Sequence, residues 1–260
     1  MSYIGKHYSN FQILASTSLE YKTIREYQNF IAFHHEVKQI VPSHDVNKNF
    51  KLLKHLKTNY PDLEIEIMEN EACIPGCPNR MFHASINLDI HDEINNDFCL
   101  SGSYCTRFCM PVIDKQPFKS VTGTTHIFPW DIEEYSKTGI NNFKFTGRDA
   151  YLGNFEGCLE RFSIYLKGID NIKNIQDYPL SCFTHHLSGS PVLNKLTVKE
   201  YKKYLPDIKH FVKFGHLCAS MCGTECRYCY KCAEKIQKVF DKKQQEERKR
   251  TAPVCIKGGF

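Results

Sequence analysis

The sequence has no long apolar segment and no apolar leader. No run in its 260 residues reaches the roughly 18 apolar residues that a membrane-spanning helix needs. The first residues, MSYIGKHYSNFQ, lack the apolar stretch of a secretory signal peptide. These absences predict a cytoplasmic protein without a membrane partner, in a compartment where thiols stay reduced and disulfides are rare.

A strong charge of either sign is also missing. The net charge is +5, which is short of the basic bias of a dedicated nucleic-acid binder. Part of the excess lies in residues 241–250, where acidic and basic side chains are mixed. We interpret that stretch as a solvated helix end, and a contact with RNA or an acidic partner is the alternative.

Cysteine, in contrast, is abundant, with thirteen residues that fall mostly into tight clusters. Thiolates spaced two or three residues apart can converge on one metal centre, and soft thiolate sites select iron–sulfur clusters or zinc. An odd total fits a full disulfide framework poorly. The clusters are Cys73-Ile-Pro-Gly-Cys77 with Cys105-Thr-Arg-Phe-Cys109, and Cys222-Gly-Thr-Glu-Cys226-Arg-Tyr-Cys229-Tyr-Lys-Cys232.

The apolar pattern predicts an α/β fold with a parallel sheet. Short apolar or alternating runs predict strands at 11–15, 37–41, 63–68 and 142–146. Helical periodicity lies between them, with capping-box spacing at Thr17 and Glu20. Strands that alternate with helices in this way favour right-handed crossovers and a partial or complete TIM-barrel-like domain.

The chain divides by composition into two predicted regions. Residues 1–167 form the barrel-like α/β domain, and 168–260 form a cysteine-rich helical appendage. Cys73 and Cys77 follow the third predicted strand, and ligands of parallel sheets collect at the carboxyl ends of strands. Their position therefore points to a site at that edge, whatever the metal.

The spacing alone leaves the metal open. Four thiolates suffice for a 4Fe–4S cluster or a structural zinc, and the first cluster is also compatible with buried or redox cysteines. Cys222, Cys226 and Cys229 match the spacing of the radical S-adenosylmethionine signature, but only 31 residues of the 260 follow them. We therefore favour a second cluster or a structural metal there, with zinc as the alternative. A packed helix face that includes Cys218 is the plainer interpretation.

Several polar side chains near the predicted strand ends are candidates for binding or catalysis. An arginine beside a cluster can hold a carboxylate substrate or balance the charge of the cluster. Each also has a structural interpretation as a loop cap or an ion pair. The candidates are Glu71, Arg80, His83, Lys144 and Arg148.

Several segments together resemble the family of the U-32 collagenase-like peptidases and their relatives, over roughly residues 10 to 232. The strongest is Asn70-Glu-Ala-Cys-Ile-Pro-Gly-Cys-Pro-Asn-Arg-Met-Phe-His83. Val41-Pro-Ser-His-Asp-Val-Asn-Lys-Asn-Phe50, Phe128-Pro-Trp-Asp-Ile-Glu-Glu-Tyr135 and Gly139-Ile-Asn-Asn-Phe-Lys-Phe-Thr-Gly-Arg148 are similar to neighbouring blocks of that family, and Cys226-Arg-Tyr-Cys229 resembles its cysteine-rich end.

The resemblance implies a barrel-like domain, an oxygen-sensitive 4Fe–4S cluster and oxygen-independent hydroxylation of RNA bases or of a small molecule, in one pair of relatives as a heterodimer. It implies Cys73, Cys77 and Cys109 as cluster ligands, with Cys105 or a C-terminal cysteine as the fourth. Arg80 and His83 would line the site.

The chain departs from the family pattern in two respects. Only four strands are evident, which implies a barrel that is partial, completed by a partner, or absent. The sequence Ile132-Glu-Glu134 stands where hydroxylating relatives carry a cysteine. Peptidase chemistry is not favoured, because no nucleophile with a base and an orienting group can be identified and no His-Glu-x-x-His motif occurs.

The sequence thus predicts an iron–sulfur enzyme that modifies RNA, a peptide or a small molecule without oxygen. Three other hypotheses remain. They are a non-catalytic electron-transfer or scaffold subunit in a homo- or heterodimer, a radical S-adenosylmethionine enzyme, and a zinc-structured RNA-binding protein.

Overall fold

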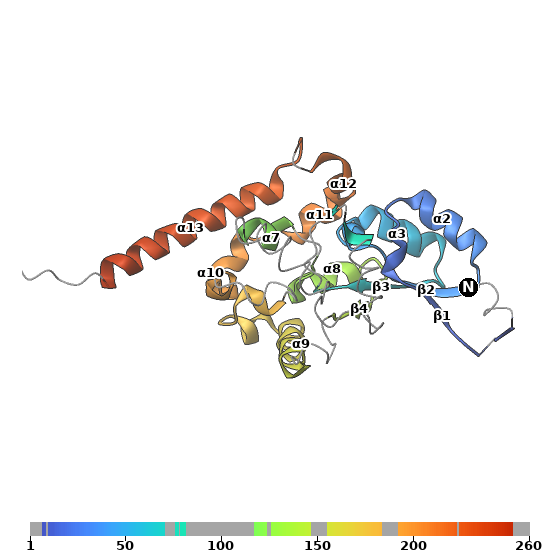
Figure 1. The fold of residues 1–260 in the computed structure, drawn as a ribbon, viewed down its shortest axis with the longest axis horizontal. Helices are drawn as coiled ribbons and strands as arrows, with labels where there is room; N and C mark the ends of the chain where they lie inside the picture. The colour runs from blue at the N-terminus through green and yellow to red at the C-terminus, as the bar shows by residue number, and fades with distance from the viewer. Residues whose placement is uncertain are drawn as a thin grey trace, which may run out of the picture.

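The computed structural model describes residues 7, 8, 10–70, 76, 77, 79–81, 117–123, 126–146, 155–183, 192–222 and 224–251. Four parallel strands form one sheet in the order β1-β2-β3-β4 (Figure 1). The strands are β1 (Ile13–Ala15), β2 (Val37–Ile40), β3 (Glu64–Met68) and β4 (Asn142–Lys144). The predicted α/β class and all four predicted strands are confirmed.

Helices and 3-10 turns connect and follow these strands. The α-helices are α2 (Ile24–Phe33), α3 (Phe50–Asn59), α7 (Pro117–Gly123), α8 (Ile132–Ser136), α9 (Phe155–Asp170), α10 (Val198–Tyr201), α11 (Ile208–Phe214), α12 (Cys218–Met221) and α13 (Tyr228–Thr251). The 3-10 turns are η1 (Thr17–Leu19), η2 (His44–Val46), η4 (Pro129–Asp131), η6 (Ile172–Ile175), η7 (Leu180–Phe183), η8 (Leu193–Lys195), η9 (Lys202–Tyr204) and η10 (Gly215–Leu217).

The first helix begins later than its capping signal predicted. Thr17 opens a 3-10 turn instead, which Glu20 ends in a left-handed conformation with φ of 50°. The capping box is formed by Thr23 and Glu26, whose side chains bond reciprocally at the start of α2. The Thr17–Glu20 prediction was therefore wrong by six residues, because the same short-range spacing occurs twice.

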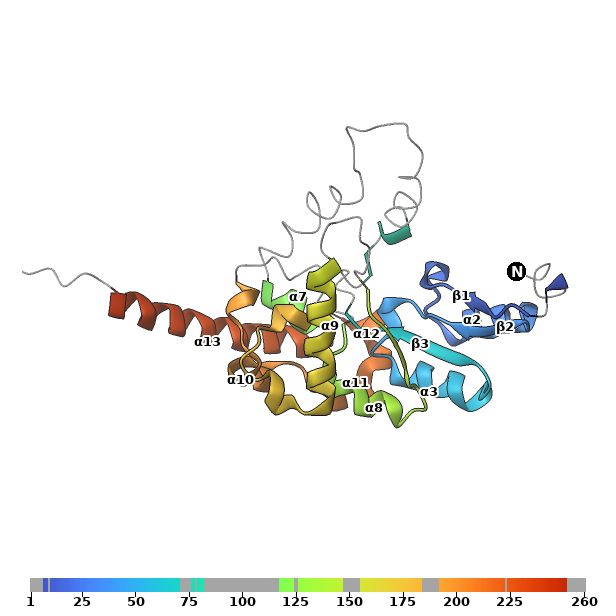
Figure 2. The same cartoon turned by 90° about the horizontal axis from the view of Figure 1, so that it is seen from below.

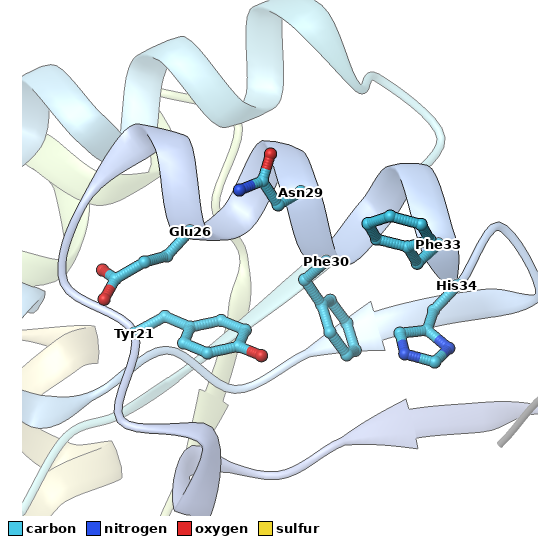
Figure 3. A pocket seen from close by; sticks show the side chains of 6 residues that line it. All are labelled: Tyr21, Glu26, Asn29, Phe30, Phe33 and His34. Carbon is cyan, nitrogen blue, oxygen red and sulfur yellow. The ribbon is translucent and has the colours of Figure 1, made fainter.

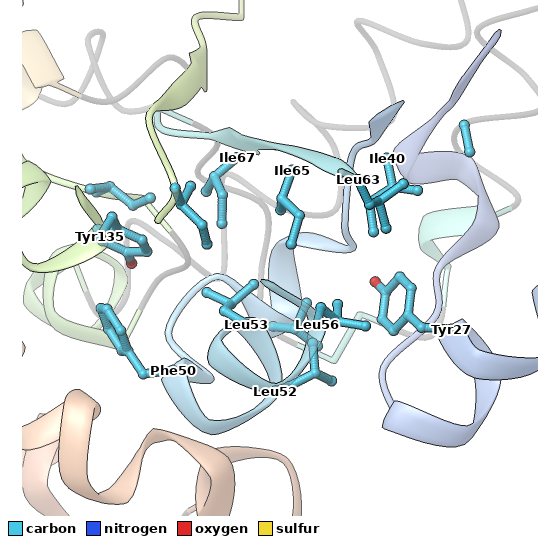
Figure 4. Close-up of a cluster of buried hydrophobic side chains, with 14 of the residues drawn as sticks. Tyr27, Ile40, Phe50, Leu52, Leu53, Leu56, Leu63, Ile65, Ile67 and Tyr135 are labelled. Carbon is cyan, nitrogen blue, oxygen red and sulfur yellow. The ribbon is translucent and has the colours of Figure 1, made fainter. Parts of the chain in front are cut away.

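The first core lies between one face of the sheet and helices α2, α3 and α8 (Figures 2 and 4). Ile65 and Ile67 of β3 meet Leu53 and Leu56 of α3, and all four side chains are buried. The alternation of β3 and the 3.6-residue period of α3 place these side chains opposite one another. Their burial fixes the register of the strand.

The opposite face of β3 and β4 is polar. Asn142 donates from Nδ2 to Oε2 of Glu64 at 2.8 Å, and Lys144 Nζ lies 3.7 Å from Oε2 of Glu66. Purely parallel sheets usually bury both faces, so a polar second face is unusual for an open sheet. Four strands in this order are compatible both with an open sheet and with part of a barrel.

A second core joins α7, α9, α10 and the first half of α13. It contains Ile164 and Tyr165 of α9 and Ala233 and Ile236 of α13. The rest of α13 extends away from the body of the molecule (Figure 1). Helix α9 runs through residue 167, so the predicted limit between the two regions falls inside a helix, and the division stays a prediction.

None of the helices in the described ranges is long and apolar enough to cross a membrane.

Candidate functional site

The carboxyl edge of the sheet gathers polar side chains from the segments that follow each strand. Glu20 comes after β1, Asp45 after β2, Asn70 after β3 and Thr146 after β4. Cys77 lies beside this edge, because Gly76 before it and Arg80 after it both donate hydrogen bonds to Asp45. We therefore describe the edge as the candidate site.

Arg80 is buried, with 7% of its surface exposed, and it binds two carboxylates. Its Nη1 atom lies 3.1 Å from Oε2 of Glu20, and its Nη2 atom lies 2.9 Å from Oδ1 of Asp45. Ser43 donates from Oγ to the same Glu20 oxygen at 2.8 Å. The arginine thereby joins the segments after β1 and β2 to the loop that carries Cys77.

Asp45 is the centre of this network. Besides Arg80, it accepts a hydrogen bond from the backbone N–H of Gly76 at 3.0 Å and pairs through Oδ2 with Lys22 Nζ at 2.7 Å. Burial alone would raise the pKa of Asp45, but the bonds from Arg80, Lys22 and Gly76 outweigh it and lower the pKa to about 2. The carboxylate therefore stays ionised and holds residue 76, directly before Cys77.

Asn70 fastens the ends of β3 and β4 together. Its Oδ1 atom accepts from the backbone N–H of Thr146 at 2.7 Å and from the Thr146 hydroxyl at 2.8 Å. Its Nδ2 atom donates to the Thr146 carbonyl at 3.0 Å. The side chain is 1% exposed, so its hydrogen bonds stabilise the fold.

Glu69 is a buried carboxyl group at the same edge, with 2% of its surface exposed. Tyr165 contacts its carboxyl group but gives it no well-formed hydrogen bond within the described residues. The nearby Tyr165 hydroxyl donates to the Ile127 carbonyl at 2.8 Å. Burial raises the pKa of Glu69 well above its ordinary value, although Tyr165 opposes the shift. The fold therefore favours the protonated form of this carboxyl group.

Two predicted polar residues can be placed. Arg80 contacts protein carboxylates, as described, and Lys144 lies on the polar face of the sheet beside Glu66 with 27% of its side chain exposed. Of the first cysteine cluster, Cys77 is half-buried and forms no disulfide. The remaining predicted residues of this site lie outside the described residues: Glu71, Cys73, His83, Cys105, Cys109 and Arg148.

The C-terminal cysteines differ in exposure. Cys222 is exposed, Cys226 and Cys229 are half-buried and Cys232 is buried. In the described part of the chain, no three His, Cys, Asp or Glu side chains form a ready-made site for a single metal ion. The metal assignments for both clusters therefore stay predictions.

A cavity of about 250 Å³ lies along α2 and contains none of the predicted site residues (Figure 3). Tyr21, Phe30 and His34 contribute rings to its lining, and Glu26 contributes a carboxylate. That carboxylate already accepts bonds from the N–H groups of Lys22 and Thr23 at the start of α2. Asn29 and His34 are the other polar residues of the lining, and this set does not by itself define a reaction.

Sequence reasoning missed Glu69. The alternation that places Ile65 and Ile67 on the core face of β3 also places residue 69 on that face, so a carboxyl group among apolar side chains was predictable from the spacing. A buried carboxyl group with a raised pKa is typical of functional sites, although structural groups show it as well.

Comparison with known proteins gives one distant likeness. No family model matches the chain, and no solved structure matches it. The chain is 23% identical over 206 residues to a curated protein of Methanocaldococcus jannaschii named as an uncharacterized protease. The match covers 78% of the chain and 54% of that relative, so the chain spans about half the length of the relative.

Fold and likeness together define the class: a mixed α/β protein with a four-stranded parallel sheet, distantly similar to a protein named as a protease. Membership of the U-32-like family is compatible with that name and belongs to the proposal below.

Proposed function

We propose that the chain is an iron–sulfur protein of the U-32-like family that modifies RNA, a peptide or a small molecule by oxygen-independent, hydroxylation-type chemistry. The observation that carries the proposal is the anchoring of Cys77 to the carboxyl edge of a parallel sheet. Gly76 and Arg80 both bond Asp45, so the cysteine is held from both sides. Such an edge is where α/β proteins bind ligands.

The donor set fits a cubane cluster. Cys73, Cys77, Cys105 and Cys109 supply four thiolates, the number that a 4Fe–4S cluster requires. A C-terminal cysteine is the alternative to Cys105. When bound, the cluster would supply a redox-active Lewis acid for a substrate oxygen. Zinc at these thiols is the competing occupant.

The protein residues would position the cluster and the substrate. Arg80 holds the cysteine loop on the sheet, which makes it a positioning residue in this scheme. The fold favours the protonated form of Glu69, which limits the negative charge beside an anionic cluster at this edge. Lys144 is partly exposed and 3.7 Å from its carboxylate partner, so its ammonium group remains accessible to an anionic substrate group.

Anaerobic purification followed by iron, sulfide and zinc analysis tests the proposal. We expect iron and sulfide in equal amounts, with loss of about four iron atoms per chain in the Cys73→Ala/Cys77→Ala variant. Cys182→Ala is the matched control, because that thiol is half-buried and outside both clusters. Full iron and activity in the double variant would exclude the edge cluster.

A non-catalytic subunit is the second candidate. The polar, partly exposed face of β3 and β4, with Glu66 and Lys144, is the observation that favours it. Parallel sheets usually have both faces covered, so this face leaves room for a partner. Light scattering gives the mass of the anaerobic protein, alone and after co-purification, and so distinguishes an enzyme that acts alone from a subunit of a larger complex. A stoichiometric partner and no activity of the isolated chain would support the subunit.

A further inference from the structure

A tight turn brings two C-terminal cysteines beside each other. Cys222 directly follows α12, and the carbonyl of Met221 accepts from the N–H of Cys226 at 2.9 Å and from that of Thr224 at 3.3 Å. Cys222 and Cys226 are also partners in a parallel backbone bridge. The backbone thus folds back on itself within five residues, and both thiols belong to one small loop.

Two further cysteines border that loop. Cys218 begins α12, one helical turn before Cys222, and Cys229 lies in the first turn of α13. Both pack against the same core beside the sheet. Cys218 interacts electrostatically with Cys222 and Cys226, and Cys229 with Cys218 and Cys222. The four thiols therefore share one neighbourhood although they come from two helices and a turn.

Cys232 lies deeper than these four thiols, with 7% of its surface exposed. It lies nearly one turn farther along α13, interacts electrostatically with Cys229 and hydrogen-bonds the side chain of Tyr228. The sequence pattern alone grouped it with Cys222, Cys226 and Cys229. We choose Cys218 in its place, because Cys218 interacts with both cysteines of the turn, Cys222 and Cys226.

A half-buried lysine faces the same group. The Lys48 ammonium lies 4.5 Å from the centre of the Phe211 ring and interacts electrostatically with Cys229, Asp131 and Cys218. An ammonium that is partly withdrawn from water is stabilised by a neighbouring anion. Burial raises the pKa of Asp131 to about 6, so this carboxylate is a weakened partner. Anionic thiolates bound to a metal would balance the rest of the Lys48 charge.

The backbone holds the cysteines against this lysine. Gly215 of η10, three residues before Cys218, packs so closely that an added Cβ would lie 1.8 Å from the Lys48 carbonyl oxygen. Such an approach is possible only for glycine. It fixes the start of α12 relative to Lys48.

We propose that Cys218, Cys222, Cys226 and Cys229 bind an iron–sulfur cluster, with the Lys48 ammonium as its charge-compensating neighbour. A single zinc ion needs four sulfurs within roughly 4 Å of one another, since Zn–S bonds are about 2.3 Å. Among the described residues, no three such side chains form a ready-made site for a single ion. A cubane core has its own volume and accepts thiolates that lie farther apart. Four cysteines also leave no open iron, which distinguishes this site from three-cysteine radical chemistry.

The full chain, purified anaerobically with iron and sulfide supplied, tests the site. We expect Cys218→Ser and Cys222→Ser each to lose about four iron atoms per chain, together with the matching visible absorbance. The matched control Cys232→Ser should keep both. Cys222 is exposed, so its substitution leaves the folded core intact.

The inference is independent of the proposed cluster at the sheet edge. Repeating the three variants in the Cys73→Ala/Cys77→Ala background separates the two sites, because the C-terminal cluster should persist there. Unchanged iron in Cys218→Ser would overturn the proposal, as would iron loss in Cys232→Ser. Stoichiometric zinc that depends on Cys218 and Cys222 would overturn the iron–sulfur assignment.

Lys48 gives a second readout. Removing a cation next to a cluster makes its reduction harder, so Lys48→Met should shift the midpoint potential to more negative values in a redox titration. Lys48→Arg retains the charge and should stay closer to the wild-type potential. A loaded Lys48→Met protein with an unchanged potential would show that Lys48 does not face the cluster.

Discussion

Arg80 and Asp45 form an ion pair of 2.9 Å that ties the cysteine loop to the segment after β2. Their sequence separation is 35 residues, and both side chains are largely buried. A pair of this kind contributes little net stability compared with an apolar pair, yet removing one partner leaves an uncompensated charge. Its role is therefore to position the loop of Cys77, and it makes that loop sensitive to mutation.

Replacing Arg80 by Met should destabilise the fold by about 3 kcal/mol, because Glu20 and Asp45 would both lose their cationic partner. Arg80→Lys should recover only part of the loss, since an ammonium cannot span two carboxylates as a guanidinium does. Urea unfolding followed by circular dichroism measures both. The control is Lys137→Met, whose ion pairs at the end of α8 are solvent-exposed, so that its substitution should change the stability little.

The depressed pKa of Asp45 predicts a loss of stability in acid. Its pKa is about 2 in the folded protein against an ordinary 3.8, so its contribution is present above about pH 4 and is lost as the pH falls toward 2. Unfolding measured at several pH values should show this slope in the wild type. In Asp45→Asn the slope should flatten and the stability at neutral pH should fall. An unchanged slope would contradict the assignment.

The strands and the main helices were predictable because their side chains obey simple periods. Ile65 and Ile67 alternate with glutamates in β3, and Leu53 and Leu56 follow the helical period in α3. These patterns reflect burial of one face, which is a local property of the sequence. The parallel order of the strands followed from the helices between them.

The contacts of the candidate sites were less predictable, because they join residues that are distant in sequence. Nothing near Arg80 in the chain indicates that Glu20 is its partner, 60 residues away. In the C-terminal region, regular spacing favoured Cys232, whereas the packing of α12 brings in Cys218. Cysteine spacing identifies candidates, and only the tertiary fold selects among them.

Glu69→Gln should stabilise the protein at alkaline pH and have little effect in acid. The folded-state pKa of Glu69 is raised, so the unfolded chain loses its proton first, and stability falls as the pH rises above the ordinary value of 4.5. A glutamine in the same place stays neutral and removes this penalty. Unfolding at pH 4 and pH 8 tests the difference. Equal pH dependence in both proteins would show that Glu69 is ionised in the fold.

Gly215→Ala should be strongly destabilising and should also weaken the C-terminal cluster that we infer. The new methyl group would lie 1.8 Å from the Lys48 carbonyl oxygen, so η10 and the start of α12 must move, and Cys218 moves with them. Gly123→Ala is the matched control, because a Cβ at this position at the end of α7 meets no atom within 4 Å. Thermal unfolding and iron content should both fall in the first variant and stay near the wild-type values in the second. Equal effects of the two substitutions would show that the close approach of Gly215 to Lys48 does not hold the cysteines in place.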